Sequence, residues 1–366
     1  MVNLKLFKNS YKNKKVLITG HTGFKGAWLS LWLNQMGADV AGFSNNKKTV
    51  PSLFEVLKLK NKIKSFKGDI SNFSEITKSV KKFQPEIIFH LAAQALVKES
   101  YKNPIETFKS NSLGTLNLLL ASNKSKKLKS IVVITSDKVY KNLEIKRGYR
   151  ENDTLMGNDP YSASKSCAEI VINMYLKSYL NNKKVKICIA RAGNVIGGGD
   201  WSPDRIIPDL FKQWSKSKKL KIRNPNSTRP WQYVLEPIGA YLYLGSLLMK
   251  NKKKIDHESF NIGPKKNVDK KVFELIKLAK NDLENLQYSV SKDNSKKEAK
   301  LLKLNCNKIY KRTGWKPVYN FNKTVKNTIS WYKNFYLKKI DNFEYSVKEI
   351  EKYILAAKKQ KVKWLS

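Results

Sequence analysis

Three glycines spaced three residues apart lie near the start of the chain, between an apolar run and an amphipathic stretch. The run 16–19 predicts a buried strand, Gly20, Gly23 and Gly26 follow it, and 26–36 predicts a helix. The first glycine would permit a tight turn, the second would let the backbone approach a pyrophosphate, and the third would let the helix pack close to the strand. The N–H groups that begin the helix would face the phosphates. The segment therefore predicts a dinucleotide-binding turn, with an ordinary glycine turn as the alternative.

The choice of dinucleotide stays open at the end of the second predicted strand. The glycine spacing is GxxGxxG rather than GxGxxG, and 43–45 holds no acidic residue to bind a ribose. Lys47 and Lys48 follow, so neither NAD nor NADP is excluded there. Asp69-Ile70, after the third predicted strand, would suit an adenine contact and would equally suit a turn or a cap.

Short apolar runs alternate with amphipathic stretches through the first half of the chain. Strands are predicted at 16–19, 39–43, 63–68, 86–91, 130–135 and 186–190, and helices at 26–36, 74–83, 104–122 and 161–180. Such alternation is typical of a parallel sheet covered on both faces. The sequence predicts an α/β fold, with a Rossmann-type doubly wound parallel sheet over residues 1–192.

Prolines interrupt this pattern after Gly193. Helices are predicted at 206–216, 237–248, 322–336 and 345–358, and 292–300 is predicted as an exposed loop or helix start. Residues 193–366 are therefore expected to form mainly a smaller, mixed C-terminal lobe that binds the substrate and could return elements to the first domain.

Lysine dominates the charge. The chain has 72 Lys+Arg against 29 Asp+Glu, a formal net charge of +43, yet seven arginines only. Nucleic-acid recognition favours arginine and clustered basic segments, whereas these lysines run from Lys5 to Lys363. An enrichment of lysine across the whole proteome would give the same net charge, and no specific nucleic-acid partner is expected.

The rarer residues indicate a compartment. Three widely spaced cysteines are typical of a reducing environment, and neither they nor the three histidines show metal-ligand spacing. A signal core and a membrane-spanning apolar run are both missing. A cytoplasmic protein with no metal and no membrane partner is expected.

Tyr161 and Lys165 stand four residues apart on a predicted helix and share one face. A nearby ammonium would lower the pKa of the tyrosine and make it a usable base. The pair follows a strand that ends in Ser136-Asp137-Lys138, and catalytic groups of open parallel sheets gather at such strand ends. These five residues predict a catalytic centre, with a surface Tyr–Lys pair and a solvated turn as the alternatives.

Several longer motifs resemble one family, the extended short-chain dehydrogenase/reductases that act on nucleotide sugars. The resemblance rests on the glycine turn, Asp69-Ile70, His90-Leu-Ala-Ala-Gln94, Asn111 and the pair Tyr161/Lys165. More narrowly, the chain resembles the 4,6-dehydratases of this family that act on CDP-glucose. The motifs behind that are Gly20-His-Thr-Gly-Phe-Lys-Gly-Ala-Trp28-Leu-Ser, Pro51-Ser-Leu-Phe54, Thr135-Ser-Asp-Lys138-Val-Tyr, Tyr149-Arg-Glu-Asn-Asp153, Arg191-Ala-Gly-Asn-Val-Ile-Gly-Gly-Gly-Asp-Trp201, Ile222-Arg-Asn-Pro225 and Arg229-Pro-Trp231-Gln.

The resemblance implies NAD as cofactor and CDP-glucose as substrate. The implied cofactor contacts are Gly20, Thr22, Gly23, Phe24, Lys25, Gly26, Asp69, Ile70, Leu91, Ala92, Ala93, Asn111, Tyr161 and Lys165. The implied substrate contacts are Gln94 and Ser136 at the sugar, Asn194 and Arg229 at the diphosphate, and Arg205 as a further candidate. Arginine forks suit phosphates. Arg191 could equally be a structural residue at a strand end.

The implied reaction is an internal hydride cycle that gives CDP-4-keto-6-deoxy-D-glucose for deoxysugar and surface polysaccharide synthesis. C4 is oxidised with Tyr161 as base, Ser136 on the C4 oxygen and Lys165 tuning Tyr161. Water leaves across C5–C6, and the hydride returns to C6. Sister dTDP-glucose enzymes carry Asp-Glu where this chain has Asp137-Lys138. Asp137 would protonate the departing hydroxyl, while Lys138 would be the C5 base or would stabilise an enolate.

Enzymes of the same fold remain alternatives: a dTDP- or GDP-sugar dehydratase, or a C4 epimerase, which needs no elimination pair. A Rossmann protein that binds RNA without catalysis is the alternative from another class. The family associates through two long helices, here 104–122 and 161–180, so a homodimer or homotetramer is expected.

Overall fold

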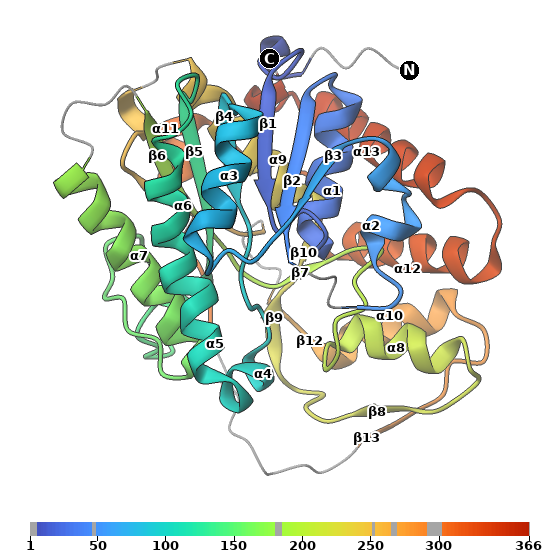
Figure 1. Cartoon of the computed structure of the whole chain (residues 1–366). Coiled ribbons are helices and arrows are strands. Elements are labelled where there is room, and N and C mark those ends of the chain that lie inside the picture. The colour runs from blue at the N-terminus through green and yellow to red at the C-terminus, as the bar shows by residue number, and fades with distance from the viewer. Residues whose placement is uncertain are drawn as a thin grey trace.

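A seven-stranded parallel sheet forms the centre of the computed structural model, which describes residues 6–45, 49–179, 185–250, 253–264, 269–290 and 302–365 (Figure 1). The strand order is β11-β6-β5-β4-β1-β2-β3. The bounds are β1 (Lys15–Thr19), β2 (Asp39–Ser44), β3 (Lys64–Lys67), β4 (Ile87–His90), β5 (Ser130–Ser136), β6 (Lys186–Ala192) and β11 (Ser259–Ile262). The chain winds outward in both directions from β1 and β4, and open α/β sheets bind their ligands at such a switch point. The predicted fold class is confirmed.

Helices cover both faces of the sheet and enclose two cores. One face carries α3 (Phe73–Phe83), α6 (Gly114–Ser122) and α7 (Pro160–Tyr179). The other carries α1 (Phe24–Gln35) and α9 (Leu235–Met249), with α12 (Phe321–Leu337) and α13 (Asn342–Lys359) in the same core. Along β1, Leu17 belongs to the first core and Val16 and Ile18 to the second. This alternation is expected of a strand buried on both sides.

The second half of the chain contributes to this sheet. β11 pairs with β6, and α9 packs against β5 and β6. The remaining elements lie beyond the carboxyl ends of the strands (Figure 1). They are α8 (Ile206–Trp214), α10 (Val272–Asp282), and the strand pairs β7 (Val195–Ile196) with β10 (Gln232–Tyr233), β8 (Leu220–Ile222) with β13 (Tyr288–Val290), and β9 (Thr228–Pro230) with β12 (Asp269–Lys271). A domain boundary at residue 192 stays a prediction.

Most long elements lie where the sequence predicts them, and the short ones differ. The predicted helix 104–122 is divided into α5 (Pro104–Phe108), a π-helical segment (Lys109–Leu113) and α6. The sequence did not predict α2 (Leu53–Val56), α4 (Val97–Lys102), α10, α11 (Asn307–Thr313) or β11. The predicted loop at 292–300 lies outside the described residues. Short elements carry too few residues for their periodicity to be recognised.

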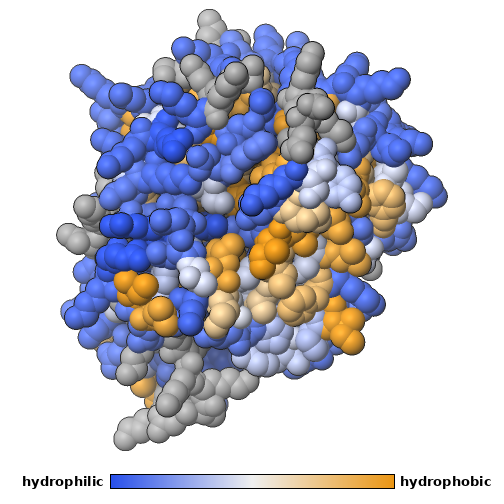
Figure 2. Space-filling model, turned by 90° about the vertical axis from the view of Figure 1, so that its left-hand side faces the viewer, coloured by the Kyte–Doolittle hydropathy of each residue, from blue (hydrophilic) through white to orange (hydrophobic). Residues whose placement is uncertain are grey.

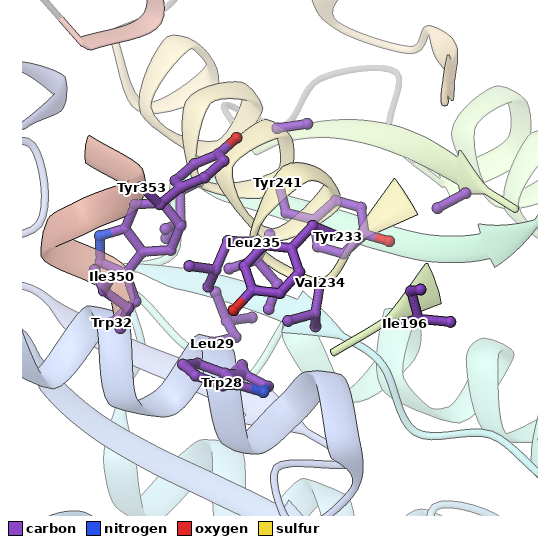
Figure 3. Close-up of a cluster of buried hydrophobic side chains, with 14 of the residues drawn as sticks. Trp28, Leu29, Trp32, Ile196, Tyr233, Val234, Leu235, Tyr241, Ile350 and Tyr353 are labelled. Atoms are coloured by element: carbon purple, nitrogen blue, oxygen red, sulfur yellow. The ribbon is translucent and has the colours of Figure 1, made fainter. Parts of the chain in front are cut away.

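An aromatic core beneath the cofactor turn joins α1 to the second half of the chain (Figure 3). Trp28 and Trp32 of α1 face side chains of α9 and α13 and are fully buried. The Trp28 indole donates a hydrogen bond to the Gly198 carbonyl at 2.9 Å. Glu236 of α9 accepts a hydrogen bond from the Tyr353 hydroxyl of α13 at 2.6 Å. In the part of the chain that is described, no helix is long and apolar enough to cross a membrane.

Candidate active site

The carboxyl ends of four strands bring the predicted site residues to one edge of the sheet. β1 leads into the glycine turn and α1, and β4 leads into the loop 91–94. β5 ends at Ser136 and continues into a 3-10 turn, η4 (Asp137–Val139). β6 leads into Gly193 and Asn194. The site is therefore built on four neighbouring elements of the central sheet.

The glycine turn has the close approaches that its sequence predicts. Gly20 has a φ of +75°, and a Cβ there would lie 2.8 Å from the Ala92 nitrogen. A Cβ on Gly26 would lie 2.1 Å from the Gly20 oxygen, so neither position can hold a side chain. Around Gly23 the nearest atom would be at 3.4 Å. Gly23 is also the N-cap of α1 and makes no side-chain cap, which leaves the helix N-terminus to a ligand.

An acidic residue does reach the end of β2, although it comes from the end of β3. Asn45 donates an amide hydrogen bond to the Asp69 carboxylate at 3.0 Å. A cavity of about 340 Å³ lies between Asn45, Lys67, Gly68, Asp69 and Glu75. Thr22 lies within 2.8 Å of the Ser44 hydroxyl at the same strand end. Lys47 and Lys48, which left NADP open, lie outside the described residues.

Ile70, Asn111 and Gln94 are held by the protein itself. Ile70 is buried, and a Cβ on Gly114 of α6 would lie 2.7 Å from its side chain. Asn111, in the π-helical segment, accepts from the Gln94 backbone at 2.8 Å and donates to Ser164 of α7 at 2.8 Å. The Gln94 amide donates to the Leu96 carbonyl and to Thr107, so its side chain lies against its own loop. Asn111 thus links the loop after β4, which carries Leu91, Ala92 and Ala93, to the helix of Tyr161.

Ser136, Asp137, Tyr161 and Lys165 come together and are buried, each less than a tenth exposed. Burial raises the pKa of Tyr161, and a hydrogen bond with Ser136 only partly offsets this. The sequence predicted a lowered pKa for this tyrosine, whereas in the free protein the pKa is raised, because burial outweighs the Ser136 hydrogen bond and the Arg205 charge. Burial, followed by the Lys25 charge, lowers the pKa of Lys165 to about 8.

Asp137 is in a setting that raises the pKa of its carboxyl group. Burial raises its pKa, while Lys138, a hydrogen bond from Ser136 at 2.9 Å, and Lys25 act in the opposite direction. Its other oxygen lies against Gly193, where an added Cβ would be 3.0 Å from Oδ2. Lys138 is half-buried beside it. A protonated Asp137 next to a cation is suited to donate a proton to a leaving hydroxyl.

Lys25 belongs to the catalytic cluster as well as to the cofactor turn. Its ammonium lies 5.9 Å from the centre of the Tyr241 ring. Burial and then Arg205 lower its pKa to about 8, and Asp137 and Asp200 oppose that shift. The sequence placed Lys25 among the cofactor contacts and gave no sign of this orientation.

The predicted substrate residues of the second half differ in their partners. Arg205 donates to the buried Asp200 carboxylate at 2.9 Å and keeps a side chain that is 40% exposed. Arg229 donates to the Thr228 carbonyl at 2.9 Å, and the Asn194 carbonyl accepts from Gln232 at 3.3 Å. The signal that sequence reasoning missed is Asp200, which lies inside the quoted Gly-Gly-Gly-Asp-Trp motif.

Arg191 is not a phosphate ligand in this arrangement. Its guanidinium is buried and bonds to Glu169 of α7 at 2.8 Å and 3.0 Å. The structural alternative for Arg191 therefore holds. Trp201 is also a packing residue, because its ring lies edge-on to that of Trp331 with the ring centres 5.8 Å apart.

Comparison with known proteins adds the family. A family model described as GDP-mannose 4,6 dehydratase matches residues 17–328. The chain belongs to that family. Among its relatives, the CDP-glucose 4,6-dehydratase of Salmonella typhimurium is 42% identical over 356 residues, covering 95% of this chain and 98% of the relative. The dTDP-glucose 4,6-dehydratase of the same organism is 24% identical and covers 87% and 92% of the two chains.

Solved structures of other nucleotide-sugar enzymes share the fold. The dTDP-glucose 4,6-dehydratase of Bacillus anthracis, in complex with NAD, superposes with a TM-score of 0.71 at 23% identity and covers 88% of this chain and 97% of its own. UDP-glucuronic acid 4-epimerase of Bacillus cereus, with UDP-glucuronic acid and NAD, gives 0.74 at 23% identity and covers 88% and 99%. Both are nucleotide-sugar enzymes with an NAD-binding Rossmann fold.

Proposed function

We propose that this protein is a CDP-glucose 4,6-dehydratase that converts CDP-D-glucose to CDP-4-keto-6-deoxy-D-glucose for deoxysugar synthesis. One observation carries the proposal: the oxidation group Ser136, Tyr161 and Lys165 shares a buried site with the elimination pair Asp137 and Lys138. A C4 epimerase has no use for that pair. The 42% identity to the Salmonella CDP-glucose 4,6-dehydratase, over nearly both whole chains, supports the choice of nucleotide.

NAD fits the cofactor region. The turn leaves no room for side chains at Gly20 and Gly26 and leaves space at Gly23, beside an uncapped helix N-terminus that favours phosphates. The cavity next to it is lined by Asp69 and Glu75, and carboxylates there favour ribose hydroxyls over an added phosphate. When bound, NAD⁺ would accept hydride from C4, return it at C6 and bring a positive charge to the site.

The cofactor would contact the residues that the sequence singled out at these strand ends. They are Gly20, Thr22, Gly23, Phe24, Lys25 and Gly26 in the turn, Asp69 and Ile70 after β3, Leu91, Ala92 and Ala93 after β4, and Asn111, Tyr161 and Lys165 on the helices.

Tyr161 takes the proton of the C4 hydroxyl in this proposal. In the free protein burial keeps that phenol protonated, so its ionisation depends on charge that arrives with the ligands and on the hydrogen bond from Ser136. Ser136 also binds the C4 oxygen. Lys165, charged below a pH of about 8, stabilises the phenolate.

Asp137 and Lys138 then act on the 4-keto sugar. The keto group acidifies the C5 proton, which Lys138 accepts as a neutral amine. If Lys138 is instead an ammonium that stabilises the enolate, a water molecule accepts the C5 proton. Asp137 gives its proton to the C6 hydroxyl, which departs as water. Because burial raises the pKa of Asp137, this carboxyl holds that proton more readily than an exposed one would.

The diphosphate would lie between Asn194, Arg205 and Arg229, with Gln94 near the sugar. Arg205 already faces the cluster, since its charge lowers the pKa of Lys25, and its 40% exposure leaves donors for a ligand. Residues 193–366 would thus supply most substrate contacts, as a lobe that also completes the sheet of a 1–192 NAD-binding domain. Nucleotide sugars and NAD are made in the cytoplasm, and we assign the protein to that compartment.

A second copy of this chain would cover the face of α5 and α7. Figure 2 shows hydrophobic side chains gathered on this side of a largely hydrophilic surface. Ile105, Leu113 and Ile170 are 69%, 45% and 55% exposed, and a shallow cavity of about 470 Å³ lies along α5 and the π-helical segment. Ile105→Asp should convert a dimer or tetramer to monomer in light scattering, whereas Leu355→Asp, an exposed leucine on α13, should not. A monomeric wild type would contradict the assembly.

The test of the proposed function is mass spectrometry of nucleotide sugars. The purified protein, with NAD⁺, is incubated separately with CDP-, dTDP-, GDP- and UDP-glucose. Loss of one water from CDP-glucose, without net NADH, is expected. Water loss from another nucleotide sugar instead would keep the reaction and overturn the CDP assignment. No change in any of them, with NAD bound, would overturn the dehydratase.

A further inference from the structure

A single buried guanidinium joins four elements behind the catalytic groups. Arg191 of β6 bonds through Nε to both oxygens of Glu169, on α7, and through Nη1 to the Tyr140 hydroxyl at 2.6 Å and the Glu151 carbonyl at 2.9 Å. Arg191 is 3% exposed, Glu169 0% and Tyr140 1%. A buried guanidinium with this many partners is held in one orientation.

The two sides of this network lead to the two catalytic groups. Glu169 lies one helical turn beyond Lys165, on α7, the helix that also carries Tyr161. Tyr140 follows directly after the turn of Asp137 and Lys138. Arg191 thus connects α7, the oxidation helix that carries Tyr161 and Lys165, to the elimination turn of Asp137 and Lys138. Its own backbone lies in β6 of the central sheet.

The same region contains further links. Glu169 also accepts a hydrogen bond at 2.7 Å from the hydroxyl of Thr135, the residue that precedes Ser136. The Tyr140 hydroxyl donates to Asn261 of β11 at 2.6 Å. Ser166 of α7 donates to the Val139 carbonyl at 2.8 Å, which is a direct but uncharged contact between helix and turn.

We propose that Arg191 is a positioning residue that keeps the elimination turn (Asp137 and Lys138) in register with the oxidation helix (Tyr161 and Lys165). The inference rests on the proposed function, because only a reaction with two successive steps on one sugar needs both groups at a fixed separation. The substrate stays in place while hydride leaves C4 and water leaves C5–C6. A shift between turn and helix would therefore let the first step proceed and slow the second.

Arginine suits this role in a way that lysine does not. Its planar fork reaches Glu169 on one edge and Tyr140 on another, whereas one ammonium on a flexible stem cannot hold both in fixed geometry. Arg191 and Glu169 form an ion pair in which the two charges balance, and both side chains are buried. Glu169 raises the pKa of Lys165, which also faces Lys25 of α1 and His90 of β4.

The first experiment measures hydrogen exchange in the full-length protein and needs no turnover. In Arg191→Lys and in Tyr140→Phe, exchange should rise together in the segments 136–140 and 160–166. Tyr353→Phe is the matched control, since it removes a tyrosine hydroxyl that bonds to the buried Glu236 at 2.6 Å, far from the turn. If neither segment, or only one of them, loses protection in Arg191→Lys, the positioning role is overturned, whatever the enzyme's substrate.

The second experiment measures how the two steps are coupled. With CDP-glucose and NAD⁺, Arg191→Lys should lower kcat by on the order of 100-fold with little change in KM, and enzyme with reduced cofactor should accumulate during turnover. Glu169→Gln/Arg191→Met removes both charges without leaving one unpaired, and should show the same accumulation while it remains folded. A variant that is slower but accumulates no reduced cofactor would overturn the inference. Wild type without water loss from any sugar would instead contradict the proposed function, and the exchange result would still decide the role of Arg191.

Discussion

The two sides of the site are built differently. On the catalytic side, Ser136, Asp137, Tyr161 and Lys165 sit at strand ends and on a long helix, and each is less than a tenth exposed. On the recognition side, Arg205 lies directly before α8 with a side chain that is 40% exposed, and it pairs with the buried Asp200.

This difference separates chemistry from recognition. Buried groups keep fixed distances and shifted pKa values, which proton transfer requires. Exposed arginines on loops can adapt to a charged ligand, and their ion pairs in the free protein contribute little to stability. Changes on the catalytic side should therefore affect kcat, and changes on the recognition side should affect KM.

The largest effect is expected for Tyr161→Phe. Loss of the base should lower kcat by on the order of 1,000-fold with KM nearly unchanged. Tyr175→Phe is the control on the same helix, because it removes a hydroxyl that donates to Asn123, at the end of α6, at 3.1 Å. Steady-state kinetics with circular dichroism as a folding check would measure both. Near-normal kcat in Tyr161→Phe would mean that another group is the base.

Arg205→Lys tests the recognition side. A charged hydrogen bond to phosphate is worth about 1.5–3 kcal/mol, so KM should rise about tenfold to a hundredfold while kcat stays similar. Arg223→Lys, whose ion pair with Asp204 is exposed, is the control and should change KM little. A fall in kcat without a rise in KM would place Arg205 on the catalytic side instead.

Gly193→Ala should give a smaller effect on the catalytic side. The added Cβ would lie 3.0 Å from Asp137 Oδ2, so the carboxyl must move by a few tenths of an ångström. We expect kcat to fall about tenfold, with more reduced cofactor present during turnover, because elimination slows and oxidation does not. Gly239→Ala is the control, because a Cβ there would have its nearest neighbour, an atom of the Trp32 ring, at 3.6 Å. Gly37 is unsuitable, since its φ of +74° would strain any side chain. Equal kinetics in Gly193→Ala and wild type would separate Asp137 from elimination.

The last prediction concerns stability and pH rather than turnover. Burial lowers the pKa of His90 to about 3, so between pH 6.5 and about 3 the unfolded chain binds a proton that the folded chain does not. The contribution of His90 to the free energy of unfolding is fully present above pH 6.5. It falls by about 1.4 kcal/mol per pH unit as the pH drops through this window. In denaturant unfolding, His90→Gln should reduce that slope. An unchanged slope in His90→Gln would show that His90 is accessible to protons.

The sequence predicted the catalytic side better than the recognition side. The β-branched run of β5, the glycine turn and the Tyr161–Lys165 spacing each encode local geometry, and the structure has them where they were expected. β11 was missed because it lies in the second half of the chain, outside the alternating strands and helices of the first half, and joins the sheet only through its pairing with β6. The pKa of Tyr161 was predicted in the wrong direction because burial, which dominates it, is a property of the folded chain.

Other features of the site depend on contacts between residues far apart in the sequence. The orientation of Lys25 toward Asp137 and the bond from Arg191 to Glu169 both depend on packing between elements. No local spacing encodes these contacts, so the sequence could single out the residues but not their partners.

The most direct test of the account follows one hydrogen atom. CDP-glucose that carries deuterium at C4 is incubated with the protein and NAD⁺, and the product is analysed by mass spectrometry and NMR. If one site performs both steps, the product has lost one water and carries the deuterium at C6, with no net NADH. Deuterium that appears in free NADH, or that stays at C4 of an unchanged sugar, would contradict an internal hydride cycle in this site.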